Sequence, residues 1–172
     1  MSDRNKVIFI SEIDVYRISN ILFNKTINIL KNRGKKREEG LVLWSGIINP
    51  KLREAYIMNI MIPKNGHWGG GVTLTHKTIL RIIDVLTKKG HFLLAQVHTH
   101  PGNFGHSYGD ERTPVSHRIG FISIVVPDYA LFKVKNMEKF FVYEYMGNFE
   151  WRLHSKSDIE RKFVIDNYLI KV

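Results

Sequence analysis

Two kinds of hydrophobic pattern alternate along this chain. Continuous apolar runs bounded by Gly, Pro or polar residues are typical of buried strands. Such runs predict strands over Val7–Ile10, Leu41–Ile48, Tyr56–Ile62, Phe92–Val97, Phe121–Val126, Phe140–Tyr145 and Phe149–Leu153. The second and third strands are separated by Asn49–Arg53 and are expected to pair as a hairpin, as are the last two around Gly147.

Apolar residues at intervals of three and four predict two helices. The first extends over about Ser11–Asn32, with Ser11 as its N-cap and Gly34 as its stop signal. The second covers Thr75–Lys89 and is followed by another glycine. The tail, Asp158–Val172, fits a helix and a strand equally well. We therefore expect an α/β domain whose mixed sheet is flanked by helices.

The length and composition narrow the class of protein. A chain of 172 residues suits a single domain, residues 1–172, and can fold without a disulfide or metal staple. The chain has no cysteine, which excludes disulfides, a thiol nucleophile and a Cys-type zinc finger. Any metal must therefore be bound by His, Asp or Glu. The N-terminal apolar run is too short for a secretory signal, and no run approaches the roughly 18 residues of a membrane span. We expect a cytoplasmic protein with no membrane partner.

The chain is basic, with 26 Lys and Arg against 16 Asp and Glu and a net charge of +10. This charge would suit a polyanionic partner or an acidic protein surface, and it also serves general solubility. The basic residues are spread out apart from the Arg33–Arg37 cluster, and no nucleic-acid-binding motif frames them. Nucleic acid is therefore an unlikely partner, and a basic nucleic-acid-binding domain is kept only as an alternative.

The candidate chemistry follows the strand Phe92–Val97. His98 and His100 are two residues apart, so on an extended strand end both imidazoles face the same way. Pro101 ends the strand pairing, and the polar loop after it carries Asp110, which can turn back toward the histidines. Two imidazoles and one carboxylate form a three-ligand zinc site that leaves a fourth position open for water, as catalytic sites do. The alternative is a surface loop that happens to be rich in histidine.

Water at such a site needs a proton acceptor. Glu39 precedes the strand Leu41–Ile48, which is expected to lie beside Phe92–Val97 and so to bring this carboxylate to the same place. Glu38 competes for the role, and both could instead be solvated charges in a loop rich in Lys, Arg and Glu.

The combined pattern resembles the signature of the JAMM (JAB/MPN) metallopeptidase family. It consists of Glu39 followed by Gly46, then His98-Thr99-His100-Pro101, then Ser107-x-x-Asp110. The resemblance extends over about Glu39–Pro127 and implies the MPN/JAB fold, which is cytidine-deaminase-like. The Leu43-Trp44-x-Gly46 and His106-Ser107 segments are most similar to short prokaryotic members, which are encoded beside ubiquitin-activating-type and conjugating-type proteins.

The resemblance also implies roles for individual residues. His98, His100 and Asp110 would bind one Zn²⁺ per chain, Glu39 would act as general acid and base, and Ser107 would donate a hydrogen bond to the oxyanion. The reaction would be hydrolysis of the bond after the C-terminal glycine of a ubiquitin-like protein, in deconjugation or precursor maturation. Such systems often serve antiphage defence, with activating-type and conjugating-type enzymes as further partners. A non-catalytic scaffold of the same fold is the alternative.

The sequence departs from the family pattern in one respect. Nine residues separate His100 from Asp110, one fewer than usual, so that Glu111 occupies the usual distance. Asp110 is preferred because Ser107-x-x-Asp110 keeps its spacing and a deletion within Gly102–Gly105 accounts for the difference. Glu111 remains the alternative ligand.

Two further features have open interpretations. His106 is either an ordinary polar loop residue or a support for the ligands. The segment Lys64–Gly71, with Trp68, could cover an extended ubiquitin-like tail bound by strand addition, or could be an ordinary glycine-rich connection.

Overall fold

The computed structural model describes residues 10–63 and 74–167. The predicted strand Val7–Ile10, except for Ile10, and the segment Lys64–Gly71 with Trp68 lie outside the described residues. In chain order the elements are η1 (Ile10–Glu12), β1 (Val15–Ser19), α1 (Asn20–Gly34), β2 (Leu41–Asn49), β3 (Glu54–Met61), α2 (His76–Lys89), β4 (Phe92–Thr99), α3 (Tyr108–Arg112), β5 (Ile122–Val126), η2 (Asp128–Ala130), β6 (Phe141–Gly147), β7 (Glu150–Leu153), α4 (Lys156–Lys162) and β8 (Phe163–Asp166).

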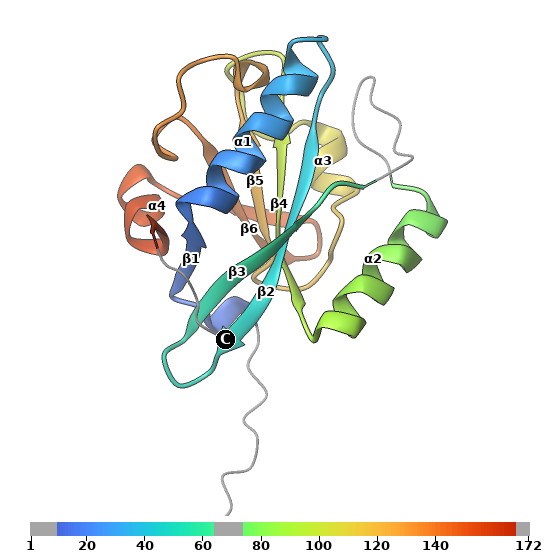
Figure 1. Cartoon of the computed structure of the whole chain (residues 1–172), viewed down its shortest axis with the longest axis vertical. Helices are drawn as coiled ribbons and strands as arrows, with labels where there is room; N and C mark the ends of the chain where they lie inside the picture. Colours follow the sequence, from blue (N-terminus) through green and yellow to red (C-terminus); the bar gives the residue numbers. More distant parts are fainter. Residues whose placement is uncertain (1–9, 64–73, 168–172) are drawn as a thin grey trace, which may run out of the picture.

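The eight strands of the described residues form one mixed sheet in the order β7-β6-β5-β4-β2-β3-β1-β8. Strand β1 runs parallel to β3 and β8, and β4 runs parallel to β5, whereas the other neighbours are antiparallel. The sheet is curled, with α1 running along it and α2 standing at its side (Figure 1). The predicted mixed sheet flanked by helices is therefore confirmed.

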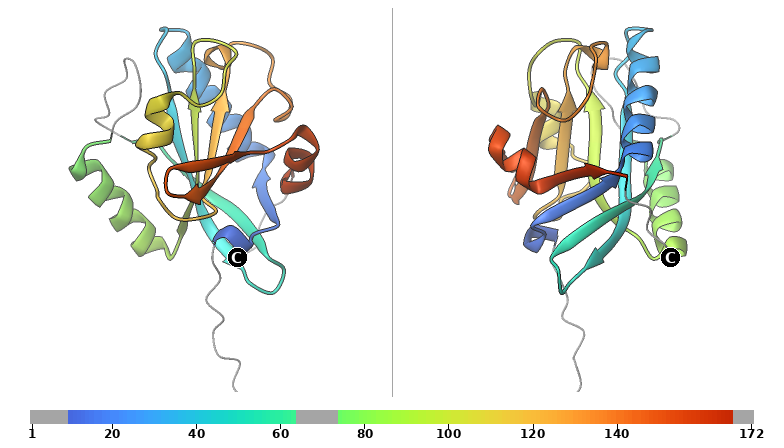
Figure 2. Two further views of the ribbon diagram at one scale, coloured as in Figure 1. Left: turned by 180° about the vertical axis from the view of Figure 1, so that it is seen from behind. Right: turned by 60° about the vertical axis from the view of Figure 1, so that its left-hand side comes forward.

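The side chains of β2 show how the two faces of the sheet are used. Val42 and Trp44 pack into the larger hydrophobic core together with residues of α1. The alternate residues Leu41 and Leu43 pack instead with Ile82 of α2 in a second, smaller core. Because successive residues of a strand point to opposite faces, α1 and α2 cover opposite sides of β2. Seen from behind, α3 lies on the near side of the sheet, and the curl of the sheet brings its β6–β7 edge toward the viewer (Figure 2).

The prediction of one long helix over Ser11–Asn32 is wrong in its first half. Val15–Ser19 forms strand β1, in which Tyr16 and Ile18 are buried and their neighbours are half-buried. The helix begins only after Ser19, whose hydroxyl accepts a hydrogen bond from the Leu22 amide and caps the first turn. The apolar residues of this segment fit both periods, and parallel pairing with β3 and β8 decided for the strand.

Ile10, the one described residue of the predicted strand Val7–Ile10, begins the 3-10 helix η1 instead. The other element predictions agree with the structure apart from their bounds. The β2–β3 and β6–β7 hairpins form, and α2 is capped by Thr75 and stopped by Gly90 in the left-handed conformation. The polar loop after β4 contains one short helix, α3. The ambiguous tail uses both predicted states, because α4 leads directly into β8, which closes one edge of the sheet beside β1.

Candidate metal centre

The structure brings His98, His100 and Asp110 together. Their ligand atoms all lie within 4.8 Å of one another, and this is the one group of its kind found in residues 10–63 and 74–167. The Nε2 atom of His98 lies 3.2 Å from Asp110 Oδ1, and the Nε2 atom of His100 lies 3.1 Å from Asp110 Oδ2. Both imidazoles are buried at the end of β4, and Asp110 reaches them from α3.

The donor atoms fit a metal ion. Within the described part of the chain, the Nδ1 atom of His98 is buried without a hydrogen-bond partner, and its buried Nε2 atom lies beside the Asp110 carboxylate. A buried polar atom that lacks a partner is costly, and coordination by a cation would satisfy the nitrogen that faces Asp110. Two imidazole nitrogens and one carboxylate oxygen are a donor set that suits zinc.

The charges of the group reinforce one another. Burial alone would lower the pKa of His100, but its ion pair with Asp110 and the negative charge of Glu39 raise that pKa above its ordinary value. Burial alone would raise the pKa of Asp110, but hydrogen bonds from His100, His98 and Ser107 hold it well below its usual range. Asp110 is therefore an anion, as a metal ligand must be.

Asp110 is oriented by the first turn of α3. The Ser107 hydroxyl donates to Asp110 Oδ2 at 2.6 Å and accepts from the Asp110 amide at 3.3 Å, while the Ser107 amide donates to the same Oδ2 at 2.7 Å. This reciprocal arrangement is a capping box. It explains the Ser107-x-x-Asp110 spacing in structural terms, and the role of Ser107 as an oxyanion donor stays a prediction.

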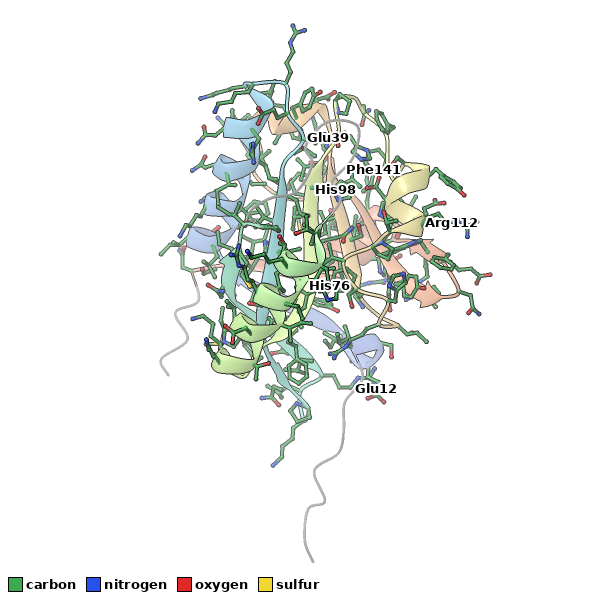
Figure 3. All side chains as sticks on the ribbon, turned by 90° about the vertical axis from the view of Figure 1, so that its right-hand side faces the viewer. Glu12, Glu39, His76, His98, Arg112 and Phe141 are labelled. Atoms are coloured by element: carbon green, nitrogen blue, oxygen red, sulfur yellow. The ribbon has the colours of Figure 1, made fainter. Side chains whose placement is uncertain are left out.

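Strand pairing brings Glu39 to the same end of the sheet. Leu41 pairs with His98, and Gly40 and Thr99 exchange hydrogen bonds, so the register continues to place Glu39 opposite His100. Figure 3 shows Glu39 and His98 at this end of the sheet, seen from the side of α2. Glu39 is half-buried, and its negative charge reaches His100.

The two alternative carboxylates lie in other surroundings. Glu38 forms an ion pair with Arg33 of α1, with 2.6 Å between Oε2 and Nη1. Glu111 is exposed and does not belong to the group of three, and its backbone carbonyl accepts a hydrogen bond from Trp151. The geometry therefore favours Glu39 over Glu38 and Asp110 over Glu111.

The sequence analysis missed a row of polar side chains on the strands next to the two histidines. Gln96, Ser123 and Tyr143 are aligned across β4, β5 and β6, and Gln96 Nε2 donates to Ser123 Oγ at 2.9 Å. His106 rests on this row, with its Nε2 atom 2.8 Å from Ser123 Oγ. The sequence did contain a signal for this row. Gln96, His98 and His100 are spaced two residues apart, so on a strand their side chains point to the same face.

His106 is thus more than an ordinary polar loop residue, because its ring is packed against other side chains. Burial is the main cause that lowers the pKa of His106 to about 3, so the ring is neutral at physiological pH. Of the other histidines, His154 is half-buried, and its Nε2 atom lies 3.1 Å from Glu144 Oε2, in keeping with a structural role.

No protein-family model matches the chain. Over 105 residues, or 59% of its length, the chain is 34% identical to a "Probable metalloprotease y4jG" of Sinorhizobium fredii. The matching segment spans 64% of that protein, which is less than two thirds of its length.

The fold is similar to a known structure. The solution structure of protein DSY2949 from Desulfitobacterium hafniense superposes with a TM-score of 0.66 at 11% identity, covering 91% of this chain and 96% of that one. This likeness supports the architecture alone. Among the described residues, no helix combines the length and apolar character needed to cross a membrane.

Proposed function

We propose that this protein is a zinc-dependent peptidase. The observation that carries the proposal is the convergence of His98, His100 and Asp110, two buried imidazoles and an ionised carboxylate, on one point at the end of β4. The sequence similarity to a protein named as a probable metalloprotease supports the same chemistry.

Each residue has a task in this chemistry. A zinc ion held by the three ligands would polarise the scissile carbonyl and lower the pKa of water. Glu39, opposite His100, takes the proton from the attacking water and passes it to the leaving amine. His98 and His100 present neutral nitrogens to the cation, and Asp110 supplies the negative charge that the two histidines lack.

The finer assignment is to the JAMM type, with a ubiquitin-like protein as substrate. In its support, Glu39 lies just before β2, His98 and His100 lie at the end of β4 and just beyond it, and Ser107-x-x-Asp110 opens α3. This order resembles the family signature. The reaction proposed is hydrolysis after the C-terminal glycine of the ubiquitin-like protein, and Ser107 would donate to the oxyanion. The biological setting proposed is a bacterial conjugation system with its activating-type and conjugating-type enzymes.

The test compares four proteins by zinc content and by release of a fluorogenic amine from the C-terminal glycine of a ubiquitin-like protein. The wild type should bind one zinc ion and turn over. His98→Ala should lose both properties. Glu39→Gln should keep zinc and lose turnover by about 10²–10⁴-fold, as expected for removal of a general base. Glu38→Gln, a neighbouring carboxylate paired with Arg33, is the matched control and should keep both.

The outcomes separate the candidate functions. A wild type that takes up no zinc would refute the metal centre, and turnover in excess chelator would refute its catalytic role. Zinc binding without hydrolysis of any peptide or isopeptide bond would indicate the non-catalytic scaffold. Full activity of Glu39→Gln would exclude Glu39 as the base.

A further inference from the structure

We infer that His106 and Trp151 are positioning residues that hold Asp110 in place for metal binding. They anchor the segment Ser107–Asp110 on both sides, through contacts with strands β5, β6 and β7. The inference rests on the proposed zinc centre and adds to it the means by which the ligand from the loop is preorganised.

The need for such anchors follows from the burial of α3. This helix has five residues, and none of them is buried. Packing of an apolar face, which holds most helices in proteins, therefore cannot fix its position. The capping box orients Asp110 within α3 but leaves open how α3 is placed against the sheet that carries the histidines.

The first anchor precedes the capping box. The ring of His106 stacks on Tyr143, with centroids 3.7 Å apart and 14° between the planes. The His106 amide donates to the Tyr143 hydroxyl at 3.1 Å. The chain passes so close that a Cβ added to Gly105 would lie 1.9 Å from the Tyr143 hydroxyl oxygen. Any side chain at position 105 would therefore push this part of the loop away from β6.

The side chains that hold His106 belong to the same sheet as the histidine ligands. The Ser123 hydroxyl lies 2.8 Å from His106 Nε2 and accepts a hydrogen bond from Gln96 Nε2. Gln96 Oε1 in turn accepts a hydrogen bond from the Val115 amide at 3.1 Å. Gln96 lies two residues before His98 on β4. The sheet thus fixes the distance between these side chains and the two imidazoles.

The second anchor follows Asp110. The indole Nε1 of Trp151 donates to the Glu111 carbonyl at 3.2 Å, one residue beyond the ligand. The Trp151 ring also stands edge-on against His106, with centroids 4.8 Å apart, so the two anchors contact each other. Arg112 adds to this side, because its guanidinium lies 5.2 Å from the Phe149 ring.

The two anchors hold Asp110 in its ligand position before any metal ion binds. A ligand that is already in place loses little conformational freedom when the cation arrives. Loss of one anchor should therefore weaken zinc binding by about 10–100-fold, which is the usual effect of removing a group that orients a ligand.

The experiment uses Trp151→Phe, which keeps an aromatic ring and removes the indole N–H. The matched control is Trp44→Phe, which removes a comparable bond from Nε1 to Thr26 Oγ1 (3.0 Å) on the opposite face of the sheet. Zinc affinity is measured against a chromophoric chelator. Amide hydrogen exchange of residues 106–112 is measured in the metal-free protein. Trp151→Phe should weaken zinc affinity at least about tenfold and speed exchange, whereas Trp44→Phe should change neither.

A second pair of variants tests the other anchor by rescue. His106→Leu should weaken zinc affinity and speed exchange, while His106→Gln, whose amide can still bond Ser123, should restore most of both. Zinc affinity within twofold of the wild type for Trp151→Phe and His106→Leu, with unchanged exchange, would overturn the inference. Zinc uptake by the wild type tests the proposed function separately. Because hydrogen exchange is measured in the metal-free protein, it tests the two anchors even if no zinc binds.

Discussion

The carboxylate of Glu144 gives a quantitative prediction about stability. Glu144 is 4% exposed and lies on β6. Its Oε2 atom is 2.6 Å from Arg152 Nη2, 3.1 Å from His154 Nε2 and 3.9 Å from Lys162 Nζ. It thus joins β6, β7 and α4 on the face of the sheet opposite to Tyr143, and replacing it with Gln removes the charge at almost constant shape.

The magnitude follows from its pKa. Burial alone would raise the pKa of Glu144, but its bonds to His154 and Arg152 and the charge of Lys162 lower it from 4.5 to about 2. Because the folded-state pKa lies below the unfolded one, the carboxylate stabilises the fold above about pH 4.5 and loses this effect as the pH falls toward 2. At 1.36 kcal/mol per pKa unit, the contribution at pH 7 is about 3 kcal/mol, of which about 2 kcal/mol is lost by pH 3.

Urea unfolding of the wild type and Glu144→Gln, in chelator at pH 7 and pH 3, measures this effect. The variant should be less stable at pH 7 by about 3 kcal/mol, because Arg152 and Lys162 lose their anionic partner. The difference in free energy of unfolding between the two proteins should be smaller at pH 3. Asp84→Asn, which removes an exposed ion pair with Lys88 on α2, is the control and should change stability little at either pH. A gap of equal size at both pH values would refute the reasoning.

Two further substitutions test how the sheet and α1 are built. Gly46→Ala places a Cβ 1.8 Å from the Tyr56 carbonyl oxygen and should lower the free energy of unfolding by about 1–3 kcal/mol, whereas Gly109→Ala, with its nearest contact at 3.7 Å, should be tolerated. Denaturant unfolding without loss of stability in Gly46→Ala would contradict the β2–β3 pairing. Ser19→Ala should cost about 1 kcal/mol and the exposed Ser11→Ala little, because Ser19 caps α1. A larger loss of stability in Ser11→Ala than in Ser19→Ala would instead support a helix that begins at Ser11, as the sequence predicted.

Local patterns were sufficient for the half of the site that lies on β4. The apolar run before His98 predicts a strand, and the two-residue period of a strand places His98 and His100 on one side. This part of the prediction needed no knowledge of distant contacts, and the structure confirms it. The pairing of β2 with β4, which brings Glu39 opposite His100, followed from two apolar runs that had to share one sheet.

The sequence preferred Asp110 and left Glu111 as the alternative ligand, and tertiary contacts were needed to decide between them. Asp110 and Glu111 are adjacent, and only the path of the loop decides which of them faces the histidines. That path depends on Tyr143 and Trp151, which come more than thirty residues later in the chain. Their side chains look like ordinary strand residues until the sheet brings β6 and β7 beside the loop.

The sequence by itself thus determined most strands, both hairpins, helix α2 and the paired imidazoles, because each of these follows from periodicity or capping within a few residues. The tertiary structure alone decided that Val15–Ser19 is a strand, since its apolar spacing suits either state and its partners β3 and β8 are distant in sequence. It also decided the position of Asp110, because a short helix without buried residues takes its place from the surfaces that hold its two ends.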